Sequence, residues 1–432
     1  MSAHAPVSVN RWKVVLLASL GGALELYDFI IYGIFAMHIA TQFFPSGDPV
    51  AALLSTFGVF AIGYISRPLG GIILSSLGDR YGRRVVFIAS IFGMSLCTLG
   101  IGLVPNYATI GVWAPVLLII LRLLQGFFLA GELPCSITYV VEEVPERATF
   151  VSGLVVFCLN SGVLVATLIS FSLHSLLNAT QMSEYGWRLA FIFGGCLGLA
   201  SYQVRKALSE SCEFKEVKDS VVRQPFRTVL NQHARQVLTG IFLAGITNAS
   251  NALLFVVLPS YMTGVLHFEI ANVSAGQNIG VAVMAVSLLV CAWAGDRVPA
   301  YLIHRVGCLL VLFGAYPFYW ALSQHLIGPI QGFVLIGLVG GFFNGTYAAL
   351  LASLFPTRVR FSGIALSLNL ATVVFTGTTP LLITQLIKST GHVTAPAYFL
   401  MTVAVLALLA SIRFSRSHAM SNPSHFPSRE HF

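Results

Sequence analysis

Five charged side chains fall inside long apolar runs of this sequence, where water cannot solvate them. In chain order they are Glu25, Asp28, Arg67, Arg122 and Glu132. An ionised group at such a depth needs a partner, a proton or a wet cavity, so these residues are candidates for function. The alternative is a set of structural ion pairs that only pack helices together, and for Arg67 and Glu132 the two interpretations are equally favoured.

Asp28 and Arg122 have the chemistry of a proton-coupled anion site. Burial favours the neutral form of a carboxyl group, whereas a neighbouring cation favours its anion, so Asp28 can alternate between the two forms. A guanidinium group such as that of Arg122 binds a carboxylate through two parallel hydrogen bonds. Glu25 lies three residues before Asp28, on the same or a neighbouring helix face. The sequence therefore predicts that protons and a carboxylate meet here.

Uncharged polar residues in other apolar runs could contact the same ligand. The candidates are Asn160, Asn248, Asn251, Asn278, Tyr347 and Asn369. An Asn in a membrane helix often serves only as a hydrogen bond between helices, and this alternative stays open for each of them.

The elements that carry these residues are membrane-spanning helices. The chain is 56% hydrophobic and 9% charged, whereas an ordinary soluble domain is about 25% charged. About 20 apolar residues cross a bilayer as a helix. We expect twelve spans, at residues 14–39, 50–77, 85–104, 112–140, 150–173, 187–204, 237–262, 274–294, 301–322, 329–354, 361–387 and 395–414.

Lys and Arg residues are concentrated in alternate gaps between these runs. Of 24 such residues, only Arg188 and Lys388 lie by the opposite gaps, at helix edges, and only Arg67 and Arg122 lie well inside spans, away from their ends. Because cytoplasmic loops carry the excess of basic residues, both termini are expected in the cytoplasm of a bacterial cell, with the chain in the inner membrane. The net charge of +8 follows from this bias, and we expect no binding of nucleic acid.

The chain divides into two halves that resemble each other. Gly78-Asp79-Arg80 and Pro145-Glu146-Arg147 in the first half have counterparts in Gly295-Asp296-Arg297 and Pro356-Thr357-Arg358 in the second. Repetition at about half the chain length indicates an internal repeat. We therefore expect six-helix bundles at 1–204 and 237–414, a cytoplasmic linker at 205–236 and a cytoplasmic tail at 415–432.

Several motifs resemble those of the major facilitator superfamily. Arg67-Pro68-Leu69-Gly70-Gly71 followed by Gly78-Asp79-Arg80-Tyr81-Gly82-Arg83-Arg84 is similar to its loop signature. A further set is similar to the metabolite:proton symporters, which include carriers of 2-oxoglutarate, citrate, shikimate, proline and betaine. It comprises Glu25-Leu26-Tyr27-Asp28-Phe29, Arg122-Leu123-Leu124-Gln125-Gly126, Gly131-Glu132, Gly186-Trp187-Arg188 and Phe355-Pro356-Thr357-Arg358-Val359-Arg360. Ser75 and Val298-Pro299-Ala300-Tyr301 depart from the signature. The fifth span also lacks the Gly-Pro-rich motif of drug antiporters.

The resemblance implies a cytoplasmic latch that closes one conformation. Its expected members are Gly78, Asp79, Arg80, Gly82, Arg83, Arg84, Arg147, Asp296, Arg297 and Arg358. A carboxylate at a helix C-terminus, as Asp79 would be, is disfavoured by the helix dipole unless a cation or another helix N-terminus meets it. Gly78 and Gly82 would permit a tight turn. The simpler alternative is a basic anchor on the cytoplasmic side.

We interpret the chain as an all-α membrane protein with the major facilitator fold. Its expected function is secondary active transport of a small carboxylate or zwitterion by alternating access, as a monomer and by proton symport. The alternatives are an exporter of a metabolite or siderophore, a channel, and an integral-membrane enzyme. We expect no catalytic residues, cofactor or metal, since the seven Cys are scattered and the eleven His cluster in loops and tails. The substrate, the direction and the choice between proton and sodium stay open.

The cation pattern predicts the position of the C-terminus. A reporter enzyme fused after Phe432 and active only outside the cytoplasm should give no activity in intact cells. The matched control is the same reporter in the gap that contains Lys388, which should be active. Activity of the C-terminal fusion would reverse the predicted topology.

Overall fold

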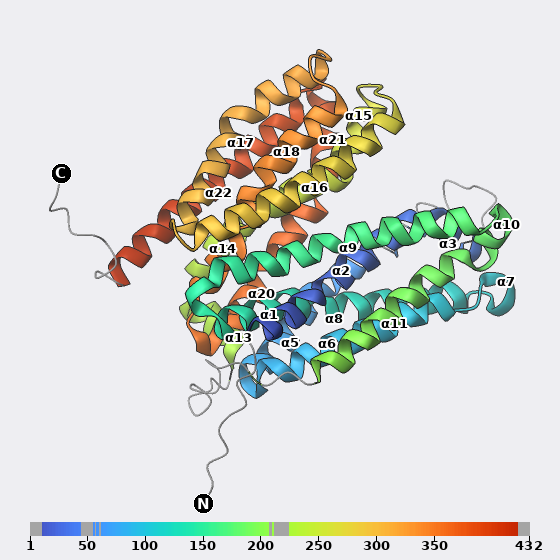
Figure 1. Ribbon diagram of the computed structural model, residues 1–432, viewed down its shortest axis with the longest axis horizontal. Helices are drawn as coiled ribbons and strands as arrows, with labels where there is room; N and C mark the ends of the chain where they lie inside the picture. Colours follow the sequence, from blue (N-terminus) through green and yellow to red (C-terminus); the bar gives the residue numbers. More distant parts are fainter. Residues whose placement is uncertain are drawn as a thin grey trace, which may run out of the picture. The chain divides into compact units, whose positions relative to one another are not determined.

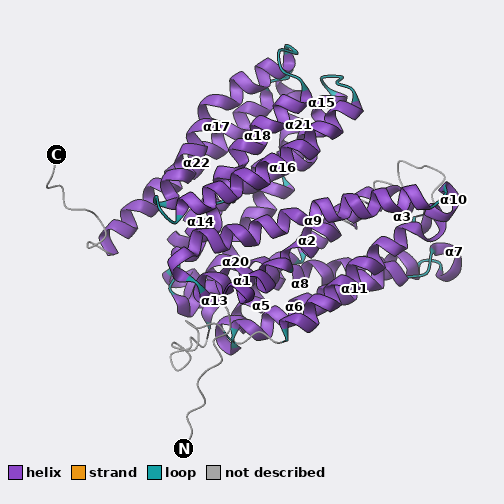
Figure 2. Ribbon diagram, in the orientation of Figure 1, coloured by secondary structure: helices purple, strands orange, loops and turns teal. Residues whose placement is uncertain are grey.

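The computed structural model describes residues 11–44, 55–56, 58–59, 62–206, 210 and 224–421. These residues form helices joined by short connections, and none of them forms a strand (Figure 2). A helix satisfies all its backbone hydrogen bonds internally, as a segment in lipid must. The predicted all-α class is confirmed.

The chain forms two compact units (Figure 1). Unit 1 comprises Met1–Phe226 with Thr357–Ala365, and unit 2 comprises Arg227–Pro356 with Leu366–Phe432. The helices before the linker are α1 (Arg11–Leu20), α2 (Gly22–Ile34), α3 (Ala36–Phe43), α5 (Arg67–Tyr81), α6 (Arg83–Leu103), α7 (Tyr107–Ile110), α8 (Trp113–Glu143), η1 (Pro145–Arg147), α9 (Ala148–Leu176), α10 (Ala179–Gln181), η2 (Met182–Gly186) and α11 (Trp187–Arg205). Those after it are α13 (Pro225–Gln232), α14 (Ala234–Ala252), η4 (Leu253–Val257), α15 (Leu258–Gly264), α16 (Ile270–Gly295), α17 (Ala300–Ser323), α18 (Pro329–Asn344), α19 (Tyr347–Ser353), η5 (Thr357–Val359), α20 (Arg360–Ala371), η6 (Thr372–Gly377), α21 (Thr379–Thr390) and α22 (Ala395–Ser421).

Ten helical stretches among the described residues are long and apolar enough to cross a membrane. They coincide with ten of the twelve predicted spans. The other two predictions fall on α11 and on the segment that leads into α5, part of which lies outside the described residues. The arrangement agrees with a twelve-helix membrane protein.

Glycines let helices of unit 1 approach closely. A methyl group on Gly162 of α9 would overlap the carbonyl of Ala23, so α2 and α9 touch at backbone distance. A methyl group on Gly126 of α8 would likewise overlap the carbonyl of Gly63. Membrane helices associate through small residues of this kind, because lipid provides no hydrophobic force between helices.

Prolines interrupt two helices of unit 2. Pro259 follows the π-helix η4, and Pro380 follows the π-helix η6. Proline has no amide hydrogen for the carbonyl four residues earlier, which for Pro259 is that of Phe255. Gln277 of α16 donates its side-chain amide to the carbonyls of Leu254 and Phe255, both at 3.2 Å. The break in η4 is therefore repaired by a neighbouring helix.

The prediction that histidines cluster in loops and tails is wrong for His304. This side chain lies in α17, fully buried, with Nδ1 3.2 Å from Oγ1 of Thr346. Its ring also packs edge-on against Phe343. His304 lies near the start of a predicted span, which suggested a place at the edge of the membrane. The interior of the helix bundle already extends to this position.

Candidate functional site

Asp28 lies at the centre of a hydrogen-bonded cluster inside unit 1. It sits in the second turn of α2 and is 5% exposed. Its Oδ2 atom accepts hydrogen bonds from Oγ1 of Thr98 at 2.6 Å and from Nε2 of Gln125 at 3.0 Å. Two donors on one oxygen stabilise the carboxylate anion. Thr98 belongs to α6 and Gln125 to α8, so three helices meet at this carboxylate.

Arg122 reaches Asp28 through Gln125. Nη1 of Arg122 donates to Oε1 of Gln125 at 2.6 Å, while the amide nitrogen of the same Gln125 side chain donates to Asp28. The guanidinium carbon lies 3.5 Å above the ring centre of Tyr32, which provides a cation–π contact. Sequence reasoning placed Asp28 and Arg122 together, but it missed Thr98, Gln125 and Tyr32 as their partners.

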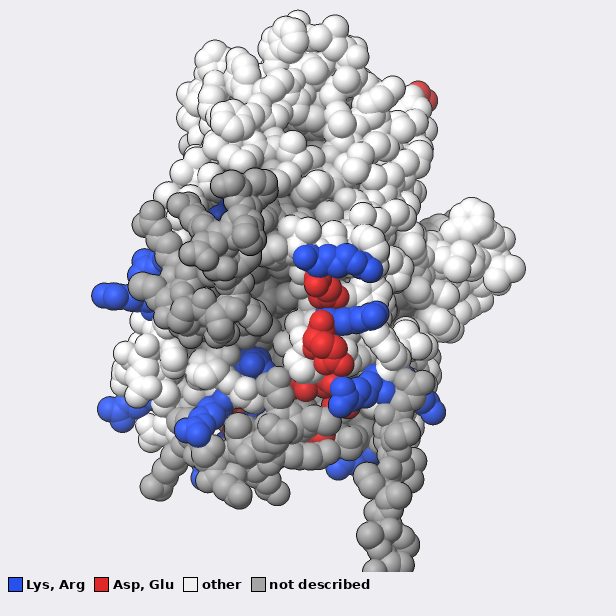
Figure 3. All heavy atoms as spheres, turned by 60° about the vertical axis from the view of Figure 1, so that its left-hand side comes forward, with Lys and Arg blue, Asp and Glu red and all other residues white. Residues whose placement is uncertain are grey.

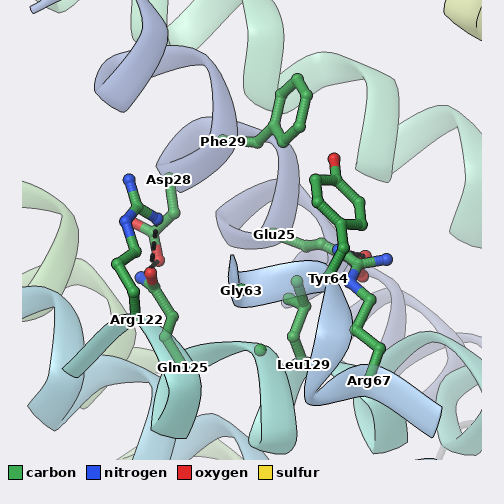
Figure 4. Close-up of a pocket in the computed structure, with 10 residues that line it drawn as sticks. Glu25, Asp28, Phe29, Gly63, Tyr64, Arg67, Arg122, Gln125 and Leu129 are labelled. Carbon is green, nitrogen blue, oxygen red and sulfur yellow. Dashed lines mark hydrogen bonds and ion pairs between the residues drawn. The ribbon is translucent and has the colours of Figure 1, made fainter. Parts of the chain in front are cut away.

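Glu25 and Arg67 form a second pair on the other side of the same cavity. Nη2 of Arg67 lies 3.3 Å from Oε1 of Glu25, and its guanidinium carbon lies 4.8 Å from the ring centre of Tyr64. Figure 4 shows the two pairs on opposite sides, with Tyr64 beside the Glu25–Arg67 pair and Phe29 near Tyr64. The rings of Phe29 and Tyr64 contact each other edge-on, 5.9 Å between centres.

The cavity between the two pairs has a volume of about 30 Å³. Its lining includes both carboxylates, both arginines and Gln125. A space of this size holds one or two water molecules. The cavity is therefore small and lined by charged groups, and a metabolite needs a wider arrangement to enter it.

Glu132 lies away from this cavity. Its Oε1 atom is 2.7 Å from Nη2 of Arg205, and both side chains are buried. Arg205, expected as the first residue of the linker, is the last residue of α11, and its long side chain turns into the bundle. The structure thus gives Glu132 a different partner from the other acids.

Two candidate polar residues of unit 2, Asn248 and Asn251, form hydrogen bonds with polar side chains of neighbouring helices. Oδ1 of Asn248 accepts from Thr372 at 3.1 Å and from Thr376 at 3.0 Å. Asn251 and Asn344 exchange hydrogen bonds through their side-chain amides, at 3.3 and 3.2 Å. Such bonds are the helix-linking role that the sequence left open for Asn. Sequence reasoning missed the two threonines.

The remaining candidates differ in exposure. Asn278 in α16 is exposed, whereas Tyr347 in α19 and Asn369 in α20 are buried. In unit 1, Asn160 of α9 donates to the carbonyl of Val156, while its Oδ1 atom is buried without a hydrogen-bond partner. That oxygen is free to accept a bond, although Asn160 does not line the cavity around Asp28.

Asp79 contacts both kinds of group that can stabilise a carboxylate at a helix C-terminus, a cation and the N-terminus of another helix. Its Oδ2 atom accepts from the backbone amide of Ser362, in the first turn of α20, at 2.8 Å. Its Oδ1 atom lies 3.3 Å from Nη2 of Arg83. The negative charge at the end of α5 is thus balanced by a guanidinium group and by the positive end of another helix.

Glu142 completes this cluster, and sequence reasoning missed it. Arg83 donates to both oxygens of Glu142, from Nε at 3.1 Å and from Nη2 at 3.0 Å, and also to the carbonyl of Thr357 at 2.6 Å. Nη1 of Arg360 lies 3.5 Å from the same carboxylate. Glu142 could have been suspected because it is a carboxylate at the end of a long apolar run, next to the Pro145-Glu146-Arg147 motif.

Other predicted members of the latch lie outside the cluster. Arg80 stacks on Tyr81, Arg147 on Trp12 and Arg297 on Trp293, while Arg358 is exposed. Arg84 donates to the carbonyl of Lys206 at 2.8 Å. Asp296 follows α16 directly and lies in unit 2. Figure 3 shows most of the visible acidic side chains gathered in one group with basic side chains beside them, and further basic side chains elsewhere on the face in view.

The two glycines of the signature have different roles. Gly82 separates α5 from α6 with φ of 114°, a conformation that favours glycine. Gly78, in contrast, lies inside α5. A methyl group there would overlap the ring of Phe361, so Gly78 permits close packing rather than a turn.

No group of three metal-ligating side chains lies together in the part of the chain that the structure describes. The paired charges around Asp28 suit proton exchange and recognition of a small charged molecule. They form no nucleophile-and-base arrangement of an enzyme.

The sequence model of the Major Facilitator Superfamily matches residues 17–375. The proline/betaine transporter of Salmonella typhimurium is 31% identical over 422 residues, covering 93% of this chain and 82% of that protein. The glycine betaine/proline/ectoine/pipecolic acid transporter of Dickeya dadantii is 32% identical with the same coverage. The structure of the proton:xylose symporter XylE superposes with a TM-score of 0.79 at 15% identity, over 94% of this chain and 95% of that one.

The buried cluster at Glu142 predicts a large loss of stability when one charge is removed. Glu142→Gln leaves Arg83 with less compensation in a dry site, and breaking a buried pair costs about 3–5 kcal/mol. The measurement is thermal unfolding of the purified protein in detergent. Glu146→Gln is the matched control, because the Glu146–Arg11 pair is more than half exposed and such pairs contribute about 1 kcal/mol or less. Equal losses in the two variants would contradict this account.

Proposed function

The chain belongs to the major facilitator superfamily and is a secondary active transporter of small metabolites; we propose that its substrate is a zwitterion and that a proton drives its uptake. As a member of a family of carriers, it is not an enzyme. The multi-pass membrane location follows from the same family and from the spanning helices.

The observation that carries this proposal is the cavity with a carboxylate and a guanidinium group on each side. Glu25 and Arg67 stand on one side, and Asp28 and Arg122 on the other. A zwitterion carries one group for each sign of charge, so it can exchange contacts with such pairs without leaving a buried ion alone. The names of both similar transporters given above include proline and betaine, which are zwitterions, and this supports the choice.

Asp28 is the proposed site of proton coupling. In the described arrangement Thr98 and Gln125 hold its anion, with Arg122 one hydrogen bond further on. A substrate carboxylate that takes Arg122 away from Gln125 loosens this network. Asp28 then binds a proton more readily, because it loses the donors that favour its anion. Proton and substrate would thus bind together.

The Asp79 cluster is the proposed latch of the transport cycle. The segment Thr357–Ala365 belongs to unit 1 and continues without a gap into unit 2 at Leu366. Asp79, Arg83 and Glu142 hold this segment through Ser362, Thr357 and Arg360. Release of these contacts would free the segment and permit the next conformation, as in other switches between packed states.

The cation pattern supports an inner-membrane protein of bacteria with both termini in the cytoplasm. We further propose that one chain works alone, since residues of a single chain line the cavity around Asp28. Export of a metabolite or siderophore is the second candidate, because the same cavity serves either direction.

Asp28→Asn tests the coupling directly, since an amide mimics the permanently protonated acid. In proteoliposomes with an inward proton gradient, the variant should not concentrate labelled proline or glycine betaine above the outside level. Exchange of labelled for unlabelled substrate without a gradient should continue. Gradient-driven accumulation by this variant that still depends on pH would transfer the coupling role to Glu25.

Two substitutions of Arg122 serve as controls in the same assay. Arg122→Ala should weaken binding by about one to two decades, because a hydrogen-bonded contact to a charged group contributes about 1.5–3 kcal/mol. Arg122→Lys should recover only part of the affinity, since an ammonium group cannot form two parallel bonds. Full affinity in Arg122→Ala would exclude a carboxylate contact at this residue.

The latch predicts a change in turnover without a change in binding. Asp79→Asn keeps the shape of the side chain but removes the charge that faces Arg83 and the start of α20. The maximal rate of uptake should fall about tenfold or more, while substrate affinity and the amount of protein in the membrane stay at the parent level. An unchanged maximal rate would remove the latch role.

A further inference from the structure

One ion pair in unit 1 takes no part in the cavity, yet it is the most deeply buried of those that contain an acid predicted for coupling. Arg205 is fully buried and Glu132 is 1% exposed. Nη2 of Arg205 lies 2.7 Å from Oε1 of Glu132, and its guanidinium carbon lies 3.7 Å above the ring centre of Phe87. The side chain of Arg205 therefore enters the bundle among α6, α8 and α1.

The same guanidinium group reaches a helix break. The first span is divided into α1, which ends at Leu20, and α2, which begins at Gly22. Nη2 of Arg205 donates to the carbonyl of Ala18, in the last turn of α1, at 3.2 Å. Carbonyls in a last helical turn lack partners within their own helix and attract cations. Arg205 thus caps α1 from another helix.

Gly21 shows that the break and the arginine fit each other. A methyl group at Gly21 would overlap Nη2 and the guanidinium carbon of Arg205. It would also come within 2.9 Å of the Glu132 carboxylate. Any side chain at this position would therefore displace the ion pair, and only glycine leaves room for it.

Stability alone gives a weak reason for such a pair. The cost of desolvating two charges offsets much of their attraction, so buried pairs add little net stability compared with apolar residues of similar size. A buried pair does fix the relative positions of the helices that carry it, because each charge is stable only beside the opposite charge of its partner. The Arg205–Glu132 pair selects one position of α1 and α2 relative to α8 and α11.

That position matters for the acids of α2. Glu25 lies about one helical turn after the break, and Asp28 about one turn later. Their partners all belong to other helices: Arg67 to α5, Thr98 to α6 and Gln125 to α8. A small shift of α2 would change all of these contacts at once, although no residue of the cavity had been changed.

We propose that Arg205 and Glu132 are positioning residues that hold the break between α1 and α2 and thereby set where Glu25 and Asp28 stand. Glu132 then acts on transport through the backbone of the first span. It does not exchange the coupling proton itself. Only the transport part of the test rests on the proposed function, and the structural part is independent of it.

The structural part measures amide hydrogen exchange around Gly21 in the purified full-length protein. Gly21→Ala should raise exchange of the amides in the turn that follows the break about tenfold or more, because the displaced guanidinium group no longer caps α1. Gly33→Ala is the matched control in the same span, since nothing lies within 4 Å of a methyl group there. It should exchange like the parent.

Two further variants address the ion pair while limiting misfolding. Glu132→Gln with Arg205→Gln removes both charges together, so no buried ion is left alone. Arg205→Lys keeps a cation for Glu132, but a single ammonium group replaces the planar group that spans Glu132 and the Ala18 carbonyl. The amides around Gly21 in the double variant should exchange as fast as those in Gly21→Ala. Their exchange rate in Arg205→Lys should lie between that of the double variant and that of the parent. Exchange at the parent level in Gly21→Ala and Arg205→Lys would overturn the proposal.

The transport part separates a positioning role from a loss of folded protein. Fewer folded carriers lower the maximal rate of proline uptake, but they leave KM and the steady-state accumulation ratio unchanged. Displacement of α2 should raise KM about tenfold and lower the accumulation ratio in both Gly21→Ala and the double variant. Parent values of both quantities would overturn the proposal. If the parent transports neither proline nor glycine betaine, the proposed substrate class is wrong, and the exchange data alone decide the role of Arg205.

Discussion

A charge inside a membrane must be neutralised by its immediate neighbours, and this requirement accounts for most of the polar architecture of unit 1. Glu25 faces Arg67, Asp28 connects to Arg122 through Gln125, and Glu132 faces Arg205. Each pair joins different helices, so satisfying the charges also fixes how the helices pack. The same groups that solve an electrostatic problem therefore define a chamber and its shape.

Unit 2 meets the same demand for polar satisfaction without intramembrane ion pairs among its described candidates. Amides and hydroxyls bond to one another, as in Asn251 with Asn344 and Asn248 with Thr372. Proline removes backbone donors in the first turns of α15 and α21, and Gln277 supplies a replacement at the first of these places. Neutral hydrogen bonds of this kind cost less to rearrange than ion pairs, since neither partner is a charge that must be compensated.

The sequence was sufficient for what depends on composition and on the position of single residues. Apolar runs predicted the helices, and acids within those runs predicted the buried site, because a charge in hydrocarbon is conspicuous whatever surrounds it. The partners of Asp28 could not be predicted in the same way. Thr98 and Gln125 meet it only because α6 and α8 have a particular rotation and depth, which hydropathy does not encode.

Arg205 and Gly78 illustrate the same limit. Arg205 follows the last apolar residue of its run, so its place in the sequence indicates a loop, yet its side chain is long enough to reach inward to Glu132. Gly78 looked like a turn residue beside Gly82. Glycine is needed there because the ring of Phe361, from a segment nearly 300 residues later in the chain, leaves no room for a side chain. Contacts between distant segments decide both cases.

The balance of signs in unit 1 has a consequence for the energetics of the cycle in a polarised membrane. Three carboxylates, Glu25, Asp28 and Glu132, are matched by three guanidinium groups, Arg67, Arg122 and Arg205. With all six ionised, these groups sum to zero, so the empty carrier can reorient without moving net charge across the electric field. A neutral zwitterion adds nothing to this sum, whereas a bound proton adds one charge, worth about 2.3 kcal/mol per 100 mV. The membrane voltage would then act on the loaded step alone, and the cell's electrical gradient would drive accumulation in addition to its pH gradient.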